Sequence, residues 1–130
     1  MNSELLLGGR NSDNRIDFTI HLNSISGATI GRQVCYKIGK WVFIGFLLQV
    51  TTTISAGGIY LFSSSTSNIP KPITNSDYAD GSGVVIACSN NGNIPLVLLK
   101  DGGIYTNLSI PIGSYSWSFV YASDEYPAIN

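Results

Sequence analysis

One strand-like segment of the chain is apolar on both faces. Residues 40–53 read KWVFIGFLLQVTTT, and successive side chains of a strand point to opposite faces. The first face carries Val42, Ile44, Phe46, Leu48 and Val50, and the second carries Trp41, Phe43 and Leu47. Since neither face suits water, we expect the first in a sandwich core. The second must also be covered, either deep in the same domain or by another copy of the protein.

Two other segments alternate between apolar and polar residues. The apolar positions of residues 15–22 are Ile16, Phe18, Ile20 and Leu22, and the large positions of residues 115–121 are Tyr115, Trp117, Phe119 and Tyr121. A wall of aromatic rings that alternates with smaller side chains is typical of a packed sandwich face. We therefore predict that both sets point into the core.

Glycine-containing turn signals separate the apolar segments at hairpin spacing, as at Ile38-Gly39-Lys40 and Asp101-Gly102-Gly103. Together they predict strands near 15–22, 32–38, 40–53, 58–63, 83–89, 94–100, 103–108 and 115–122. Short strands without helical periodicity indicate an all-β, antiparallel, β-sandwich or jelly-roll-like domain. We assign this head domain to residues 15–130. Residues 1–14 we interpret as a linker or neck remnant, or as a segment exchanged between copies.

The composition and net charge of the chain limit the kinds of partner that it can bind. Hydrophobic residues make up 44% of the chain and charged residues only 12%, against roughly 25% charged in typical soluble domains. Much of the surface must therefore be neutral and polar, or buried in an oligomer. The seven Lys and Arg residues are scattered, and the net charge is −1, so we expect no nucleic-acid partner.

The start of the chain lacks the pattern of a secretory signal. The apolar run Trp41–Val50 is shorter than the roughly 20 residues of a membrane-spanning helix.

Catalytic chemistry has little support in the sequence. His21 is the one histidine, and Glu4 and Glu125 lie near opposite ends, so a catalytic triad is not indicated. Asp77 and Asp80 are close in sequence, but in an irregular loop we interpret them as turn formers and not as paired catalytic carboxylates. We expect a non-enzyme without cofactor or metal, although Asp77 and Asp80 leave a calcium site open. His21 is interpreted as a surface or interface histidine, with a protonation switch at a subunit contact as the alternative.

The two cysteines, Cys35 and Cys88, each lie in an apolar strand-like segment. Such thiols usually behave as small buried hydrophobic residues. We therefore expect both to be buried, and the sequence alone does not decide whether they pair.

Recognition by aromatic rings and polar groups fits the surface better than catalysis. The set that we expect to be exposed is Tyr60, Tyr78, Tyr105, Tyr126, Asp77, Asp80, Asn107 and Asp124. Tyrosine combines a flat apolar face with a hydrogen-bonding tip, and Asp and Asn accept hydroxyl protons, so the set suits saccharides. The longest irregular segment is residues 64–82, and long loops often carry function. The candidate saccharide site is therefore Asp77, Tyr78 and Asp80, completed by Tyr105 and Asn107 of a neighbouring subunit.

The order of three motifs carries a family resemblance. They are YKIGKWVFI at residues 36–44, IPKP at 69–72, and GSYSWSFVY at 113–121. Over residues 32–122 the chain resembles the C-terminal head domain of tail fibres or baseplate receptor-binding proteins of phages and prophages of Gram-positive bacteria. The resemblance implies a homotrimeric head at the virion tail tip that binds host cell-surface or cell-wall saccharide beside other tail or baseplate proteins. It places no binding residue. A purely structural trimerisation module of a fibre and a trimeric jelly-roll adhesin or signalling domain remain as alternatives.

Overall fold

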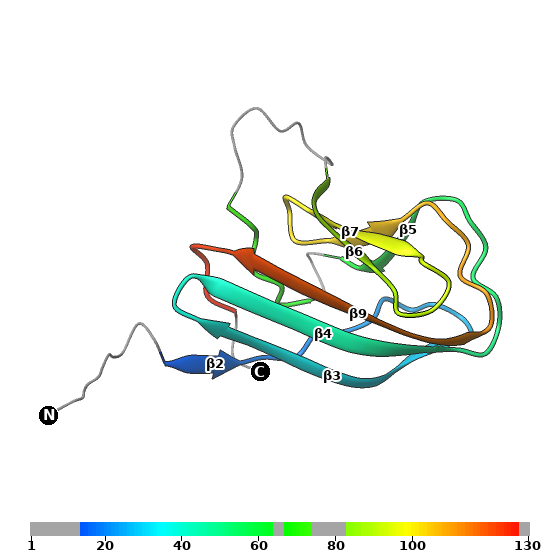
Figure 1. The fold of residues 1–130 in the computed structure, drawn as a ribbon, viewed down its shortest axis with the longest axis horizontal. Coiled ribbons are helices and arrows are strands. Elements are labelled where there is room, and N and C mark those ends of the chain that lie inside the picture. Colours follow the sequence, from blue (N-terminus) through cyan, green and yellow to red (C-terminus); the bar gives the residue numbers. More distant parts are fainter. Residues whose placement is uncertain (1–13, 64–66, 74–82, 128–130) are drawn as a thin grey trace, which may run out of the picture.

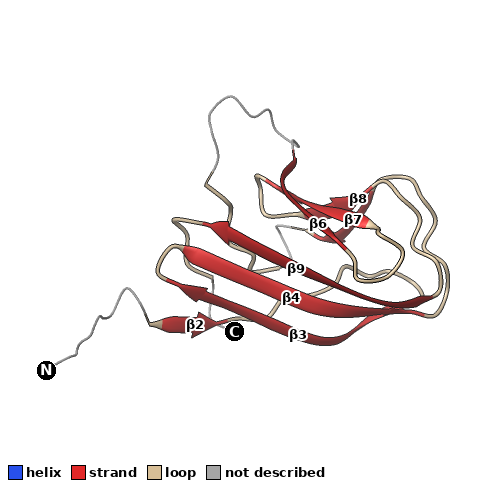
Figure 2. Ribbon diagram, in the orientation of Figure 1, coloured by secondary structure: helices blue, strands red, loops and turns tan. Residues whose placement is uncertain are grey.

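Two antiparallel four-stranded sheets pack face to face in the part of the chain that the computed structural model describes, residues 14–63, 67–73 and 83–127 (Figure 1). The first sheet has the order β2-β3-β4-β9 and the second β5-β8-β7-β6. The strand bounds are β2 Arg15–Asp17, β3 Ala28–Ile38, β4 Trp41–Val50, β5 Ile59–Phe62, β6 Gly83–Cys88, β7 Pro95–Leu99, β8 Ile104–Thr106 and β9 Gly113–Ala122. These residues contain strands and loops and no helix (Figure 2). The predicted all-β sandwich is confirmed.

The core lies between the sheets. Of the inward set predicted for residues 15–22, Phe18 and Ile20 are buried in it and Leu22 packs against it, but Ile16 does not belong to it. In β4 the inward residues are at most 3% exposed, and the four aromatic residues of β9 are at most 5% exposed. From the second sheet, Leu61, Leu96, Leu98 and Ile104 are fully buried. The rings of Phe46 and Phe62 meet edge to face across the two layers, with centroids 5.0 Å apart. The inward faces of β4 and β9 are therefore as predicted.

Strand pairing is nested: β4 pairs with β9, β5 with β8, and β6 with β7. A long hairpin folded over on itself produces this arrangement, as in jelly rolls. The connections β4–β5 and β8–β9 both pass from one sheet to the other, and a bridge joins them (Figure 1). At this bridge Ile54 N–H donates to Ile110 O at 2.9 Å, and Ile110 N–H donates to Ile54 O at 2.8 Å. The paired crossing closes one end of the sandwich.

The predicted turns are present where glycine supplies a backbone conformation that other residues rarely adopt. Gly39 turns the β3–β4 hairpin with φ +58°, and Gly102 turns β7 into β8 with φ +91°. A Cβ at residue 102 would also lie 2.9 Å from Ile69 O, so glycine there serves both the turn and close packing.

The first strand is shorter than the sequence suggested. The strand β2 ends at Asp17, and one more backbone hydrogen bond to β3 follows, from Phe18 N–H to Cys35 O at 3.1 Å, whereas the prediction ran to residue 22. The side-chain amide of Gln33 then replaces the ladder: it accepts from Ile20 N–H at 2.7 Å and donates to Ile20 O at 2.9 Å. Beyond this point the chain crosses toward the second sheet, where Asn23 N–H donates to Leu61 O at 2.8 Å. The apolar alternation is real, but backbone pairing is divided between two sheets.

Two strand ends also differ from prediction. The strand β3 begins at Ala28, four residues earlier than expected, because a bulge between Ile30 and Arg32 keeps it paired with β4. The strand β4 ends at Val50, before the threonines. Of the irregular segment at 64–82, the described part, residues 67–73, has no regular structure. The assignment of residues 1–14 as a linker falls almost wholly outside the described residues and stays a prediction.

The cysteines behave differently from each other. Cys35 is buried and Cys88 is exposed, and both are free thiols. The expectation that both are buried is therefore wrong for Cys88. It lies at the end of β6, an edge strand, where outward positions such as Ile86, 66% exposed, face solvent.

Candidate functional site

A pair of tyrosines lies on the outer face of the second sheet. Tyr60 of β5 and Tyr105 of β8 are direct register partners, and their rings are 5.1 Å apart at 59°. Tyr60 is 45% exposed and Tyr105 is half-buried. Two neighbouring rings on a sheet face form a stable aromatic surface, because cross-strand contact restrains both.

Polar groups and glycines surround this pair. The Tyr105 hydroxyl donates to Asn107 Oδ1 at 2.5 Å, which leaves the Asn107 NH₂ group as a donor. Gly103 lies under Tyr60, since a Cβ there would be 3.4 Å from the ring. Beside it, Asp101 Oδ1 accepts from Gly103 N–H at 2.8 Å. We call Tyr60, Tyr105 and Asn107 the tyrosine site. It combines apolar ring faces with hydrogen-bonding groups, as sugar recognition requires.

The predicted saccharide residues are partly placed. Tyr105 and Asn107 are in direct contact. Asp77, Tyr78 and Asp80 lie outside the described residues, so their part of the candidate site stays a prediction. Tyr60 was one of the expected exposed residues but not part of the candidate site. Only the register of β5 on β8 shows that it belongs beside Tyr105.

The outer face of the first sheet is apolar at the end nearest the β3–β4 hairpin. Trp41 is 56% exposed and Val120 is 55% exposed, and Ile38 and the half-buried Phe43 lie beside them. We call Ile38, Trp41, Phe43 and Val120 the apolar patch. Of the predicted interface residues, Trp41 and Phe43 belong to it. Leu47 is half-buried on the same face, beyond Gly45.

The charged side chains at the edge of this patch pair with each other. Tyr36 stacks on Phe43 with ring centroids 4.7 Å apart. The guanidinium of Arg15 lies 4.0 Å from the Tyr36 ring centroid, and its Nε is 2.8 Å from Asp17 Oδ1. The charges of this edge are therefore paired with each other, and the patch itself carries none.

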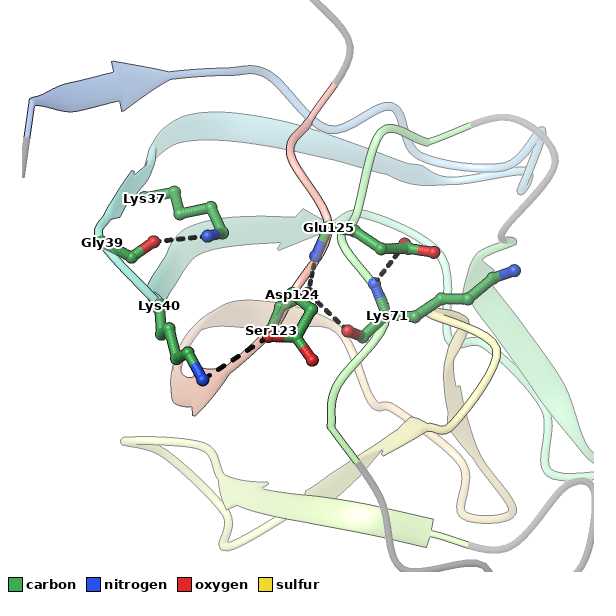
Figure 3. Close-up of polar contacts among 7 residues, drawn as sticks. All are labelled: Lys37, Gly39, Lys40, Lys71, Ser123, Asp124 and Glu125. Carbon is green, nitrogen blue, oxygen red and sulfur yellow. Dashed lines mark hydrogen bonds and ion pairs between the residues drawn. The ribbon is translucent and has the colours of Figure 1, made fainter. Parts of the chain in front are cut away.

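A buried lysine lies at the hairpin end of the sandwich (Figure 3). Lys37 is 2% exposed. Its Nζ donates to Gly39 O. The same Nζ lies 4.4 Å from the Tyr126 ring centroid. Burial lowers the Lys37 pKa; Asp124 opposes this shift and Lys40 adds to it. Sequence reasoning missed this residue, although it lies two positions after Cys35 on an inward face. Because its ammonium already holds the hairpin turn, we assign Lys37 to structure and not to catalysis.

The C-terminal residues lock the IPKP loop against this end. Ser123 is fully buried and its Oγ donates to Lys71 O at 2.5 Å. Lys71 N–H donates to Glu125 Oε1 at 2.9 Å, and the Tyr121 hydroxyl donates to Pro70 O at 2.7 Å (Figure 3 shows the contacts of Ser123 and Glu125). These contacts explain the irregular but ordered path of this loop.

His21 is exposed, as the simpler interpretation expected. Its backbone N–H donates to Ser67 Oγ at 3.0 Å. The residue borders a surface hollow of about 510 Å³ formed by residues 20–25, 28–30 and Gln33. The Gln33 amide is committed to Ile20, whereas the polar side chains of His21, Ser24 and Thr29 also line this hollow. A protonation switch at His21 stays untested.

Within the described ranges, no group of three or more His, Cys, Asp or Glu side chains is arranged to hold a metal ion. No helix there is long and apolar enough to span a membrane. Comparison of the chain with protein-family models, with curated proteins and with solved structures found no match.

Proposed function

We propose that this domain is a non-catalytic receptor-binding head of a phage or prophage tail fibre or baseplate, which binds host surface saccharide as a homotrimer. The observation that supports this most is the difference between the two outer faces of the sandwich. One face carries the uncharged apolar patch, and the other carries the tyrosine site. Copies can join through the apolar end of the first sheet near the β3–β4 hairpin, while the outer face of the second sheet stays free to display ligand sites.

Self-association is supported by exposed apolar surface in a chain with few charges. Trp41 and Val120 are each more than half exposed, on neighbouring strands. Contiguous apolar surface of this kind usually marks an interaction site. Aromatic residues are enriched and charged residues are depleted at the centres of interfaces. Other copies of the same chain are the simplest partners for this patch, and the family resemblance supports three of them.

Saccharide binding is supported by the chemistry of the tyrosine site. Ring faces stack on the apolar C–H faces of sugars, and the Tyr105 hydroxyl and the Asn107 amide reach sugar hydroxyls. Single sites of this size bind weakly. A trimer presents three identical sites to one surface, which raises the overall affinity without new contacts. Attachment to a repetitive cell wall therefore suits the arrangement.

The test compares adsorption to purified cell walls by the parent chain and by a Tyr60→Ala/Tyr105→Ala variant. We expect the parent to adsorb and the variant to lose at least tenfold in affinity. The variant should keep its oligomer and its fold, with a modest fall in melting temperature from the lost cross-strand pair. Ile112→Ala is the matched control, because Ile112 is a 66% exposed apolar residue outside the site; it should adsorb like the parent. Equal adsorption by parent and double variant would remove the tyrosine site from the proposal.

Two alternatives predict different results. A purely structural trimerisation module would assemble but bind no saccharide, so an array of bacterial surface glycans would be blank for the intact oligomer. A trimeric jelly-roll adhesin or signalling domain would bind a protein partner instead. The tyrosine site favours the saccharide-binding head, because a purely structural module has no need for exposed, mutually oriented rings.

A further inference from the structure

Gly45 interrupts the outer side of β4 where a side chain would fit. Glycine weakens the interior of a strand and often marks a place where a ligand or another backbone approaches closely. The backbone does not require it, since Gly45 is not among the glycines with positive φ. A Cβ there would lie 3.7 Å from both Ser118 Oγ and Val34 O, which is ordinary contact. The position therefore keeps a space open that the fold could have filled.

This space is a surface hollow of about 450 Å³ on the outer face of the first sheet. Its size is within the range of small-ligand sites, about 300–1,000 Å³. Gly45 lies in its floor, and the side chains around it come from β3, β4, β9 and the β6–β7 turn. They are Arg32, Val34, Leu47, Asn90, Ser116 and Ser118. The hollow lies beyond Gly45 from the apolar patch, so an assembly through Trp41 and Phe43 leaves it beside the contact.

The polar groups around the hollow are donors without a carboxylate among them. Arg32 is exposed and has no ion pair within the described ranges. The hydroxyls of Ser116 and Ser118 have no hydrogen-bond partner in that part of the chain. Asn90 is held against β9: its Oδ1 accepts from Ser116 N–H at 2.8 Å, and its N–H donates to Ser116 O at 3.2 Å. This pairing leaves the Asn90 NH₂ group as a further donor.

We propose that the hollow over Gly45 binds an anionic group, a carboxylate or a phosphate, of the saccharide ligand. The proposal rests on the saccharide-binding function and adds the charge class of the ligand. Arginine matches the geometry of both anions and forms charge-assisted hydrogen bonds that are stronger than neutral ones. The Ser116 and Ser118 hydroxyls and the Asn90 side-chain amide add hydrogen-bond donors around the Arg32 guanidinium. Val34 and Leu47 supply apolar walls for the attached sugar ring.

The experiment is an NMR titration of the ¹⁵N-labelled full chain with D-glucuronate, with glycerol phosphate and with neutral D-glucose as separate probes. We expect saturable shifts of the backbone amides of Gly45, Ser116 and Ser118 with at least one anion and none with glucose. The responding anion identifies the source as a uronic acid or a phosphate-bearing polymer. Equal shifts with glucose, or no shifts at these amides with either anion, would overturn the proposal.

Three variants make the result specific. Gly45→Val fills the hollow, and the folded protein should melt no lower than the parent while losing the shifts, because valine favours strands and its Cβ fits. Arg32→Gln keeps the hollow and should weaken anion binding at least tenfold. Lys71→Gln removes an exposed cation elsewhere and should bind like the parent. Undiminished binding by Arg32→Gln would contradict the assignment.

Failure of this site and failure of the proposed function are separable. If Tyr60→Ala/Tyr105→Ala abolishes wall adsorption while Gly45→Val leaves both adsorption and anion shifts intact, the saccharide function stands and the hollow is not its anion site. If the anion shifts are present but the protein does not adsorb to cell walls, the hollow binds anions and the proposed function fails.

Discussion

Removal of the Trp117 indole tests the register of the closing strand. Trp117 is 1% exposed, and its ring centroid lies 5.5 Å from that of Phe46. Its Nε1–H donates to Ile94 O at 2.8 Å. Truncation of a buried Trp to alanine costs about 3–5 kcal/mol. Domains have only about 5–15 kcal/mol of stability in total, so Trp117→Ala should leave a marginal fold.

A second substitution separates the hydrogen bond from the cavity. Ile94 O also accepts from Ser89 N–H at 3.1 Å. Trp117→Phe therefore leaves no unpaired carbonyl and loses one hydrogen bond, about 0.5–1.5 kcal/mol, plus a smaller packing loss. We expect stability to fall in the order parent, Trp117→Phe, Trp117→Ala.

The assay is urea unfolding followed by far-UV circular dichroism. Ser116→Ala is the control: its side chain points outward and has no hydrogen-bond partner within the described residues, so its free energy of unfolding should stay within about 0.5 kcal/mol of the parent. The reasoning is refuted if Trp117→Ala unfolds at the parent's midpoint, or if Ser116→Ala is the more damaging substitution. Either result would mean that the register of β9 is shifted by one residue, so that its inward and outward faces are exchanged.

Three further predictions concern Gln33 and the two cysteines. Gln33→Ala removes both hydrogen bonds to the Ile20 backbone and should cost about 1–3 kcal/mol in urea unfolding; an unchanged midpoint would show that water replaces the amide. A disulfide-exchange reagent should modify one thiol per native chain, Cys88, and two in urea, since Cys35 is buried; two fast thiols in the native protein would contradict this burial. Burial also raises the Cys35 pKa from 9.0 to about 11, so the unfolded chain loses this proton first and the free energy of unfolding should fall between about pH 9 and 11. Cys35→Ala should reduce that fall in a pH series of urea melts.

Local patterns predicted the faces of the strands well. The alternation in β4 and β9 indicates burial directly, because side chains of a strand point to alternate faces and the apolar face must be buried in the core. Glycines at tight turns are similarly local signals, as at Gly39 and Gly102. The β2 region shows the limit of this reasoning. Phe18 and Ile20 are buried as predicted, but burial does not reveal that a glutamine side chain has replaced the backbone ladder.

The candidate site depended on information that no local pattern contains. Tyr60 and Tyr105 are far apart in sequence and meet through the register of β5 on β8. The hollow over Gly45 needs β3, β4 and β9 side by side, with Ser118 opposite the glycine and Ser116 opposite Leu47. From sequence, Gly45 was one residue of an apolar run. The role of Gly45 in keeping a hollow open can be inferred only from the fold, which shows that no side chain fills the space above it.

Sedimentation equilibrium of the full chain at micromolar concentration tests the central claim most directly. Each large side chain of the apolar patch that leaves water contributes about 1.5–3 kcal/mol, so copies should associate. The proposed homotrimer has the mass of three 13.9 kDa chains. A Trp41→Ser/Val120→Ser variant should be folded and monomeric, since both side chains are more than half exposed in the single chain. A parent protein that stays at 13.9 kDa would contradict the account, because the apolar patch would then face water with no copy to cover it.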